Sequence, residues 1–175
     1  MRTRLATLDD AKDIATLLAE YMTEQGLGHP GATADEIRRD VLSGASGQRI
    51  ILAEREGRAV GFAAWDRVYD LHWGAGGVQI ADLYVEPGSR GHGVALSMLA
   101  AVCAEGRSHG AVFLRGASYD RASATGRFYE RIAVGHDSAE CHCAGRAFRR
   151  LAELDGTPVR TLIRNLPPRE WNFEA

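Results

Sequence analysis

The chain has 175 residues, of which 45% are hydrophobic and 25% are charged, and its formal net charge is −2. This length and balance suit one globular domain with a single sizeable core, and the absence of a broad basic field argues against a nucleic-acid partner. No apolar run approaches the roughly 20 residues that cross a bilayer, and the N-terminus lacks the apolar region of a secretory signal. We therefore expect a soluble, cytoplasmic protein with no membrane partner.

In chain order, the first half predicts two helices among several strands. The first helix runs from a cap at Asp9 or Asp10 to about Glu24, because its apolar residues recur with helical spacing. The second opens at the capping box Thr33-Ala-Asp-Glu36. Strands are expected over residues 2–6, 49–54, 59–65 and 78–85, with a mobile glycine-rich loop over 66–77.

The second half continues with a helix over Val94–Ser108, which places Leu96, Leu99, Ala100 and Cys103 on one stripe. The further expected elements are strands over 111–116, 139–143 and 158–165, and helices over 122–132 and 145–154. Because a crossover helix joins them, the strands on either side of Val94–Ser108 must be parallel. We see no repeat or linker, so residues 1–175 are expected to form one domain, with 166–175 as a C-terminal tail.

Three cysteines, Cys103, Cys141 and Cys143, give little sign of a special role. An odd number without a secretory signal argues against a disulfide framework. The pattern Cys141-His142-Cys143 is not a zinc-finger spacing, and no second cluster of ligands accompanies it. We expect no metal site.

The most informative stretch is Val85-Glu-Pro-Gly-Ser-Arg-Gly-His-Gly-Val-Ala95, between an expected strand and the helix 94–108. The first turn of a helix leaves backbone N–H groups unpaired at the positive end of the helix dipole, which favours a phosphate. Glycines at 91 and 93 let an anion approach the backbone, and Arg90 can add charge. The P-loop pattern is absent, and a dinucleotide fingerprint lacks its third glycine because Leu96 stands there.

A third phosphate motif, R/Q-x-x-G-x-G/A, fits Arg90-Gly91-His92-Gly93-Val94-Ala95 at every fixed position. With this motif, and most specifically in IADLYVEPGSRGHGVALSML, the chain resembles the GNAT superfamily of N-acetyltransferases over roughly residues 2–134. The resemblance implies an α/β fold with a mixed, mostly antiparallel central sheet, one splayed parallel strand pair and helices on both faces. It also implies acetyl-CoA as cosubstrate and a small-molecule amine as acceptor. The implied cosubstrate-binding residues are Leu83, Tyr84, Val85, Arg90, Gly91, His92, Gly93, Val94 and Ala95.

In this family the strand before the motif carries a bulge and splays from the next parallel strand, and pantetheine enters the gap like an added strand. By resemblance, Leu83 and Val85 offer the free backbone groups here. An ordinary buried strand is equally compatible with these residues.

Two residues are the catalytic candidates. Tyr129, in Arg-Phe-Tyr-Glu-Arg, resembles the family tyrosine that acts as an acid toward the leaving thiolate, for which a phenol is chemically suited. The family asparagine before it and the Gly-Phe after its helix are replaced here by Ala122 and Ala133-Val134. Asp82 is the candidate base, although the acid of related diamine acetyltransferases falls on Ala81, and unbroken strand alternation would put Asp82 on the opposite face.

The acceptor is not defined by the sequence. His72 and Trp73, or Tyr21 and Glu24, could line its site, and the identity of the base is open. A second reading is a non-catalytic acyl-CoA-binding sensor or partner-binding module on the same fold, for which the missing acid at Ala81 is the main support. The sequence also leaves a homodimer open.

Overall fold

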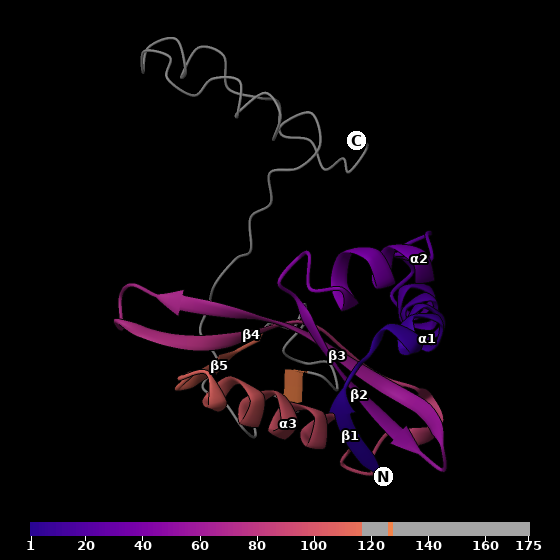
Figure 1. Cartoon of the computed structure of the whole chain (residues 1–175). Coiled ribbons are helices and arrows are strands. Elements are labelled where there is room, and N and C mark those ends of the chain that lie inside the picture. Colours follow the sequence, from indigo (N-terminus) through magenta and orange to yellow (C-terminus); the bar gives the residue numbers. More distant parts are fainter. Residues whose placement is uncertain (117–125, 128–175) are drawn as a thin grey trace, which may run out of the picture. The chain divides into compact units, whose positions relative to one another are not determined.

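A five-stranded sheet organises the described residues, which are 1–116, 126 and 127 of a computed structural model (Figure 1). The chain divides into two compact units, Met1–Tyr119 and Asp120–Ala175, and the sheet belongs to the first. Tyr129, Cys141, Cys143 and the elements expected after residue 132 lie outside the described residues. Of the expected helix 122–132, only residues 126 and 127 are described, and both are helical. The single domain over 1–175 stays a prediction.

The sheet is mixed and mostly antiparallel, as the sequence predicts. Its strands lie in chain order and comprise β1 (Arg2–Leu5), β2 (Arg49–Arg55), β3 (Arg58–Asp70), β4 (Ala75–Val85) and β5 (Phe113–Arg115). Neighbours are antiparallel from β1 to β4, whereas β4 and β5 are parallel. The helix α3 (Val94–Ser108) connects the parallel pair, and its observed bounds equal the predicted ones.

One face of the sheet is covered by α1 (Ala11–Glu24) and by α2 (Ala34–Glu36), which continues into η2 (Ile37–Leu42) (Figure 1). The capping box at the start of α2 forms as expected, since the Thr33 amide donates to a Glu36 carboxylate oxygen at 2.8 Å. The core on this face is a cluster that includes Ile14, Leu17, Phe62 and Tyr84.

The other face is covered by α3, and here the predicted stripe is wrong. The buried residues are Val94, Met98, Leu99, Val102 and Gly106, whereas Leu96 is 51% exposed and Cys103 is also exposed. Val94, Met98, Val102 and Gly106 are spaced by four, and the sheet meets this row. Gly106 explains the orientation, because a Cβ there would lie 2.6 Å from Val78. Without a Cβ at this position, the backbone of α3 can lie close to β4.

The loop predicted over 66–77 is also wrong, since most of it belongs to the two long strands β3 and β4. Their pairing continues from Asp66↔Gln79 to Asp70↔Ala75. The Asp70 carboxylate caps the short turn by accepting hydrogen bonds from the amides of His72 and Trp73, and it also pairs with Arg115. Glycine lowers strand propensity in general, but Gly77 is required here because the Phe113 ring of β5 fills the space of its side chain.

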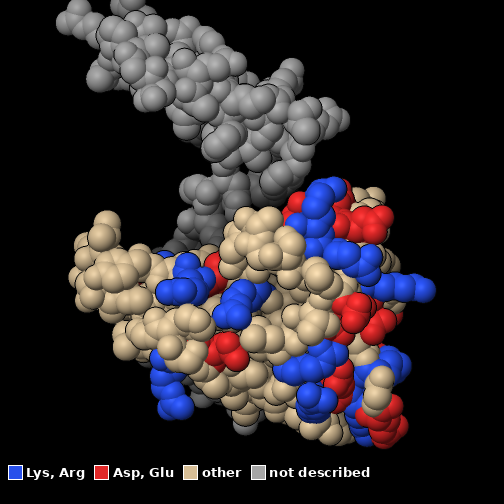
Figure 2. Space-filling model, in the orientation of Figure 1, with Lys and Arg blue, Asp and Glu red and all other residues tan. Residues whose placement is uncertain are grey.

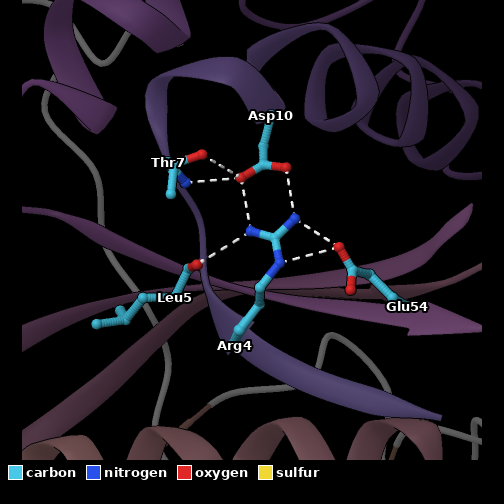
Figure 3. A network of polar contacts seen from close by, with 5 residues as sticks. All are labelled: Arg4, Leu5, Thr7, Asp10 and Glu54. Atoms are coloured by element: carbon cyan, nitrogen blue, oxygen red, sulfur yellow. Dashed lines mark hydrogen bonds and ion pairs between the residues drawn. The ribbon is translucent and has the colours of Figure 1, made fainter. Parts of the chain in front are cut away.

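A polar network joins the start of α1 to the sheet (Figure 3). Arg4 of β1 donates to both carboxylate oxygens of Asp10 at 2.7 Å and, through Nε, to Glu54 of β2 at 2.9 Å. Asp10 also accepts from the Thr7 amide at 2.7 Å. Asp10 therefore occupies the N-cap position of α1, as predicted, but its side chain does not cap that helix.

None of the helices within residues 1–116 and 126–127 is long and apolar enough to cross a membrane.

Candidate functional site

A run of unpaired backbone amides lies where β4 passes into α3. The first backbone bond of the helix is Ser97 N–H to the Gly93 carbonyl, at 3.0 Å. The amides of residues 94–96 consequently have no partner within the helix. Those of residues 91–93 also donate to no described residue, whereas Ser89 and Arg90 close the turn before them by donating to Glu86 and Pro87. Six consecutive N–H groups at the positive end of a 15-residue helix thus have no partner among the described residues, an arrangement that suits an anion.

Two glycines give this run its shape. Gly91 and Gly93 both have φ of +77°, and Gly93 is the left-handed N-cap of α3. A Cβ at either position would meet no atom within 4 Å. The space on the Cβ side of both residues is therefore open among the described residues. His92, between them, is exposed, and its ring Nδ1 lies 2.8 Å from the Arg90 carbonyl oxygen.

The side chain of Arg90 is engaged within the protein. Its guanidinium forms two hydrogen bonds with Glu24 of α1, at 2.9 and 2.5 Å, and lies 5.6 Å from the centre of the Tyr84 ring. Its Nε donates to the Val85 carbonyl at 2.8 Å. The sequence places Arg90 correctly in the motif, but its partner on α1 is distant in the chain and carries no sequence signal.

β4 contains the expected bulge. The register moves from Trp65↔Ile80 to Ala64↔Asp82, so Ala81 is the extra residue. Asp82 and Tyr84 pair with Ala64 and Phe62, which belong to the cluster under α1. Asp82 therefore lies on the α1 face of the sheet, and simple alternation does not relate it to Ala81.

The Asp82 carboxyl is half-buried, and no described residue gives it a hydrogen bond or an ion pair. Burial raises its pKa above the ordinary value. A raised pKa makes the Asp82 carboxylate a stronger base.

Beyond the bulge, one edge of β4 is open among the described residues. β5 pairs with β4 only over Gly77–Gln79. The Glu86 amide donates to Val60 of β3, and backbone groups alternate along a strand, so those of Leu83 and Val85 face away from β3. Of these groups, the Val85 carbonyl is already used by Arg90. The other groups can pair with an extended ligand.

A broad groove of about 1210 Å³ lies between α1 and the last residues of β4, and it reaches Pro87, Gly88 and Arg90 just before the free amides. Its charges largely compensate one another, because Arg58 pairs with Glu86 and Arg90 with Glu24. Figure 2 shows the same mixing of acidic and basic side chains over this side of the molecule.

The acceptor candidates are widely separated. Tyr21 packs against Tyr84, with ring centres 5.6 Å apart, and Glu24 pairs with Arg90, so both lie near the motif. His72 and Trp73 lie in the turn before β4, at the opposite end of that strand from the free amides. Trp73 packs edge-on against Phe113.

The fold is that of a mixed α/β protein, in which a run of unpaired amides follows a strand with an open edge. Residues 12–133 match the model of the acetyltransferase (GNAT) family. Since this match spans more than half of the chain, the protein belongs to that family, as the sequence motif predicts. It is an acyltransferase of the GNAT type, a family that generally uses acetyl-CoA.

Solved structures share the fold at low sequence identity. A ribosomal-protein-alanine N-acetyltransferase from Brucella melitensis biovar Abortus 2308 is 23% identical, with a TM-score of 0.66, covering 81% of this chain and 98% of its own. An integron cassette protein from V. cholerae is 18% identical, with a TM-score of 0.71 and coverages of 87% and 97%. An aminoglycoside acetyltransferase from an uncultured soil metagenomic sample is 18% identical, with a TM-score of 0.65 and coverages of 81% and 95%. No curated protein gives a match by sequence.

Proposed function

We propose that the protein transfers the acetyl group of acetyl-CoA to a primary amine of a small molecule such as a polyamine, an amino acid or an aminoglycoside-like antibiotic. The observation that carries the proposal is the run of six free amides from Gly91 to Leu96, which suits the diphosphate of coenzyme A. The oxygens of a diphosphate accept several N–H groups at once, and the helix dipole adds to the attraction.

The pantetheine arm would extend from the diphosphate along the open edge of β4. Its two amide groups would pair with the outward-facing backbone groups of Leu83 and Val85, as a strand pairs with a sheet edge. The bulge at Ala81 supports this arrangement, since a bulge interrupts regular pairing and bends the strand. The thioester would then lie close to the bulge.

At the thioester, a neutral amine attacks the acetyl carbon and a C–N bond forms. The Leu83 amide, or one of its neighbours, would donate to the oxyanion of the tetrahedral intermediate. As the intermediate collapses, the C–S bond breaks and Tyr129 gives its proton to the CoA sulfur. The proton of the amine nitrogen leaves to Asp82, directly or through water, and burial favours this role by raising the Asp82 pKa.

A direct test measures release of free CoA thiol from acetyl-CoA with a panel of polyamines, amino acids, aminoglycosides and peptides. Turnover with one class identifies the acceptor and supports the proposal. If CoA binds but no amine in the panel is acetylated, the second reading, a non-catalytic acyl-CoA-binding module, is favoured. If CoA does not bind, both readings are wrong.

Replacing Tyr129 by phenylalanine tests the acid. We expect kcat to fall about 100-fold, because a positioned general acid contributes at least that much, while the Kd of acetyl-CoA stays the same. Tyr69→Phe is the matched control, since that tyrosine is 65% exposed on the β3–β4 hairpin. An unchanged kcat in Tyr129→Phe would remove this residue from the mechanism.

A further inference from the structure

Arg90 directly precedes the free amides in the chain, yet its side chain makes contacts within the protein. Its five N–H donors form a planar fork, and a carboxylate matches two of them. Glu24, in the last turn of α1, supplies that carboxylate with both of its oxygens. A guanidinium held this way has fewer donors left for a bound phosphate.

The same side chain also closes the turn that leads to the amides. Through its Nε, Arg90 donates to the carbonyl of Val85, five residues earlier. This bond ties Val85, the last residue of β4, to the residue that directly precedes the free amides. The turn between them is tightened further by the Arg90 amide, which donates to Pro87.

Tyr84 ties the cluster to α1 a second time. The Arg90 guanidinium lies over its ring, and the ring itself packs against Tyr21. The Tyr84 hydroxyl donates to Glu20, one turn before Glu24, at 3.4 Å. The end of α1, the end of β4 and the start of the amide run are therefore held together around Arg90.

We propose that Glu24 is a positioning residue for the cosubstrate: it holds Arg90, and Arg90 in turn fixes the turn that presents the amides of residues 91–96. Glu24 thereby supports binding of the diphosphate without touching it. This inference rests on the proposed binding of acetyl-CoA. The competing arrangement, in which the Arg90 guanidinium binds the phosphate directly, has the opposite consequence, because Glu24 would then compete with the ligand for Arg90.

The two arrangements differ in the sign of one substitution. If Glu24 positions the turn, Glu24→Gln raises the Kd of CoA about two- to fivefold, the size that a partly exposed ion pair supports. If Arg90 binds the phosphate and Glu24 competes for it, Glu24→Gln lowers the Kd. The double variant tests whether Glu24 acts through Arg90. A positioning pair acts as a unit, so Glu24→Gln/Arg90→Gln should bind CoA no more weakly than Arg90→Gln alone.

The experiment is calorimetric titration of CoA into the full-length wild type, the two single variants and the double variant. Asp40→Asn is the matched control, because it removes the carboxylate of another exposed arginine pair, Arg39–Asp40, and changes the net charge equally. Steady-state kinetics with S-acetylpantetheine, which lacks the diphosphate, provides a second comparison. A general loosening of the fold would raise the KM of this thioester as well, whereas a local effect on the diphosphate site would not. We expect Glu24→Gln to raise the KM of acetyl-CoA and to leave the KM of S-acetylpantetheine unchanged.

Three results would overturn the inference: a lower Kd in Glu24→Gln, effects that add in the double variant, or an equal rise in KM for both thioesters. Failure of the wild type to bind CoA is a different result, since it defeats the proposed function itself. Equal thermal midpoints of Glu24→Gln and Asp40→Asn would show that both variants remain folded.

Discussion

Among single residues, glycine is needed at positions 91 and 93 because the backbone angle φ is positive there. The sequence predicts these glycines from the space that a phosphate requires. The structure adds a second requirement, since both have φ of +77° and both have open space around the Cβ position. An L-residue fits here sterically but is strained in its backbone.

Gly93→Ala should therefore lower the free energy of unfolding by about 1–2 kcal/mol, the usual cost of a left-handed conformation for a residue with a Cβ. It should also weaken CoA binding, because relief of the strain moves the amides at the start of α3. Gly88→Ala is the control, since Gly88 lies in the same turn with open space and no positive φ. Urea unfolding measures both variants, and equal stability of the two would contradict the role of φ.

The residues that sequence reasoning misses are those whose partners lie far away in the chain. The motif identifies Arg90, and its local geometry suggests a phosphate ligand. In the structure Arg90 instead pairs with Glu24, which is 66 positions earlier in the chain. This pairing cannot be inferred from the sequence, because it depends on α1 lying beside the end of β4. Strict alternation along the strand would place Asp82 on the face opposite to Ala81. The bulge at Ala81 interrupts the alternation, so this rule does not apply there.

Among the helices and strands, the helix bounds are predicted well from glycines and capping residues at their ends. The helix α3 spans Val94–Ser108 and Thr33 opens α2, as the sequence predicts. The predicted stripe of α3 is wrong because the helix is apolar on more than one side, so periodicity alone does not select the row that meets the sheet. The β3–β4 hairpin escapes prediction because Gly76 and Gly77 resemble loop residues until Phe113 lies against Gly77.

The junction of β1 with α1 gives the clearest electrostatic prediction. Hydrogen bonds from Arg4, against the opposing effect of burial and with help from Thr7, hold the pKa of Asp10 well below its usual range. Asp10 is 7% exposed, so Asp10→Asn leaves Arg4 without one of its two carboxylates in a mostly buried place. We expect Asp10→Asn to lower the free energy of unfolding by about 3 kcal/mol at pH 7. Asp40→Asn, at an exposed ion pair, should leave the free energy of unfolding almost unchanged.

The pH dependence follows from the sign of that shift. Because the folded-state pKa is depressed, the contribution of Asp10 is complete above the unfolded pKa of about 3.9 and is lost as the pH falls below it. The stability difference between wild type and Asp10→Asn should therefore shrink between about pH 4 and pH 2. Urea unfolding at a series of pH values measures it. A difference that stays constant into acid would mean that the ion pair does not stabilise the fold.

At the scale of the whole molecule, family membership is predictable from one strand, one turn and one helix. The motif requires a strand before it and a helix after it, and β4 and α3 satisfy both conditions. The mixed sheet follows from the crossover rule, because a helix between two strands of one sheet makes them parallel. The acceptor is not predictable in this way, since its recognition depends on side chains from separate elements.

The remaining whole-molecule prediction concerns the number of domains. The second unit, Asp120–Ala175, has fewer than 60 residues, and a chain of about that length buries only about 60% of its surface when it folds alone. We therefore expect residues 1–175 to behave as one domain and to unfold in a single transition. Scanning calorimetry measures this, because a two-state domain has equal calorimetric and van't Hoff enthalpies. Two separate transitions, or a calorimetric enthalpy well above the van't Hoff value, would show instead that the units fold independently.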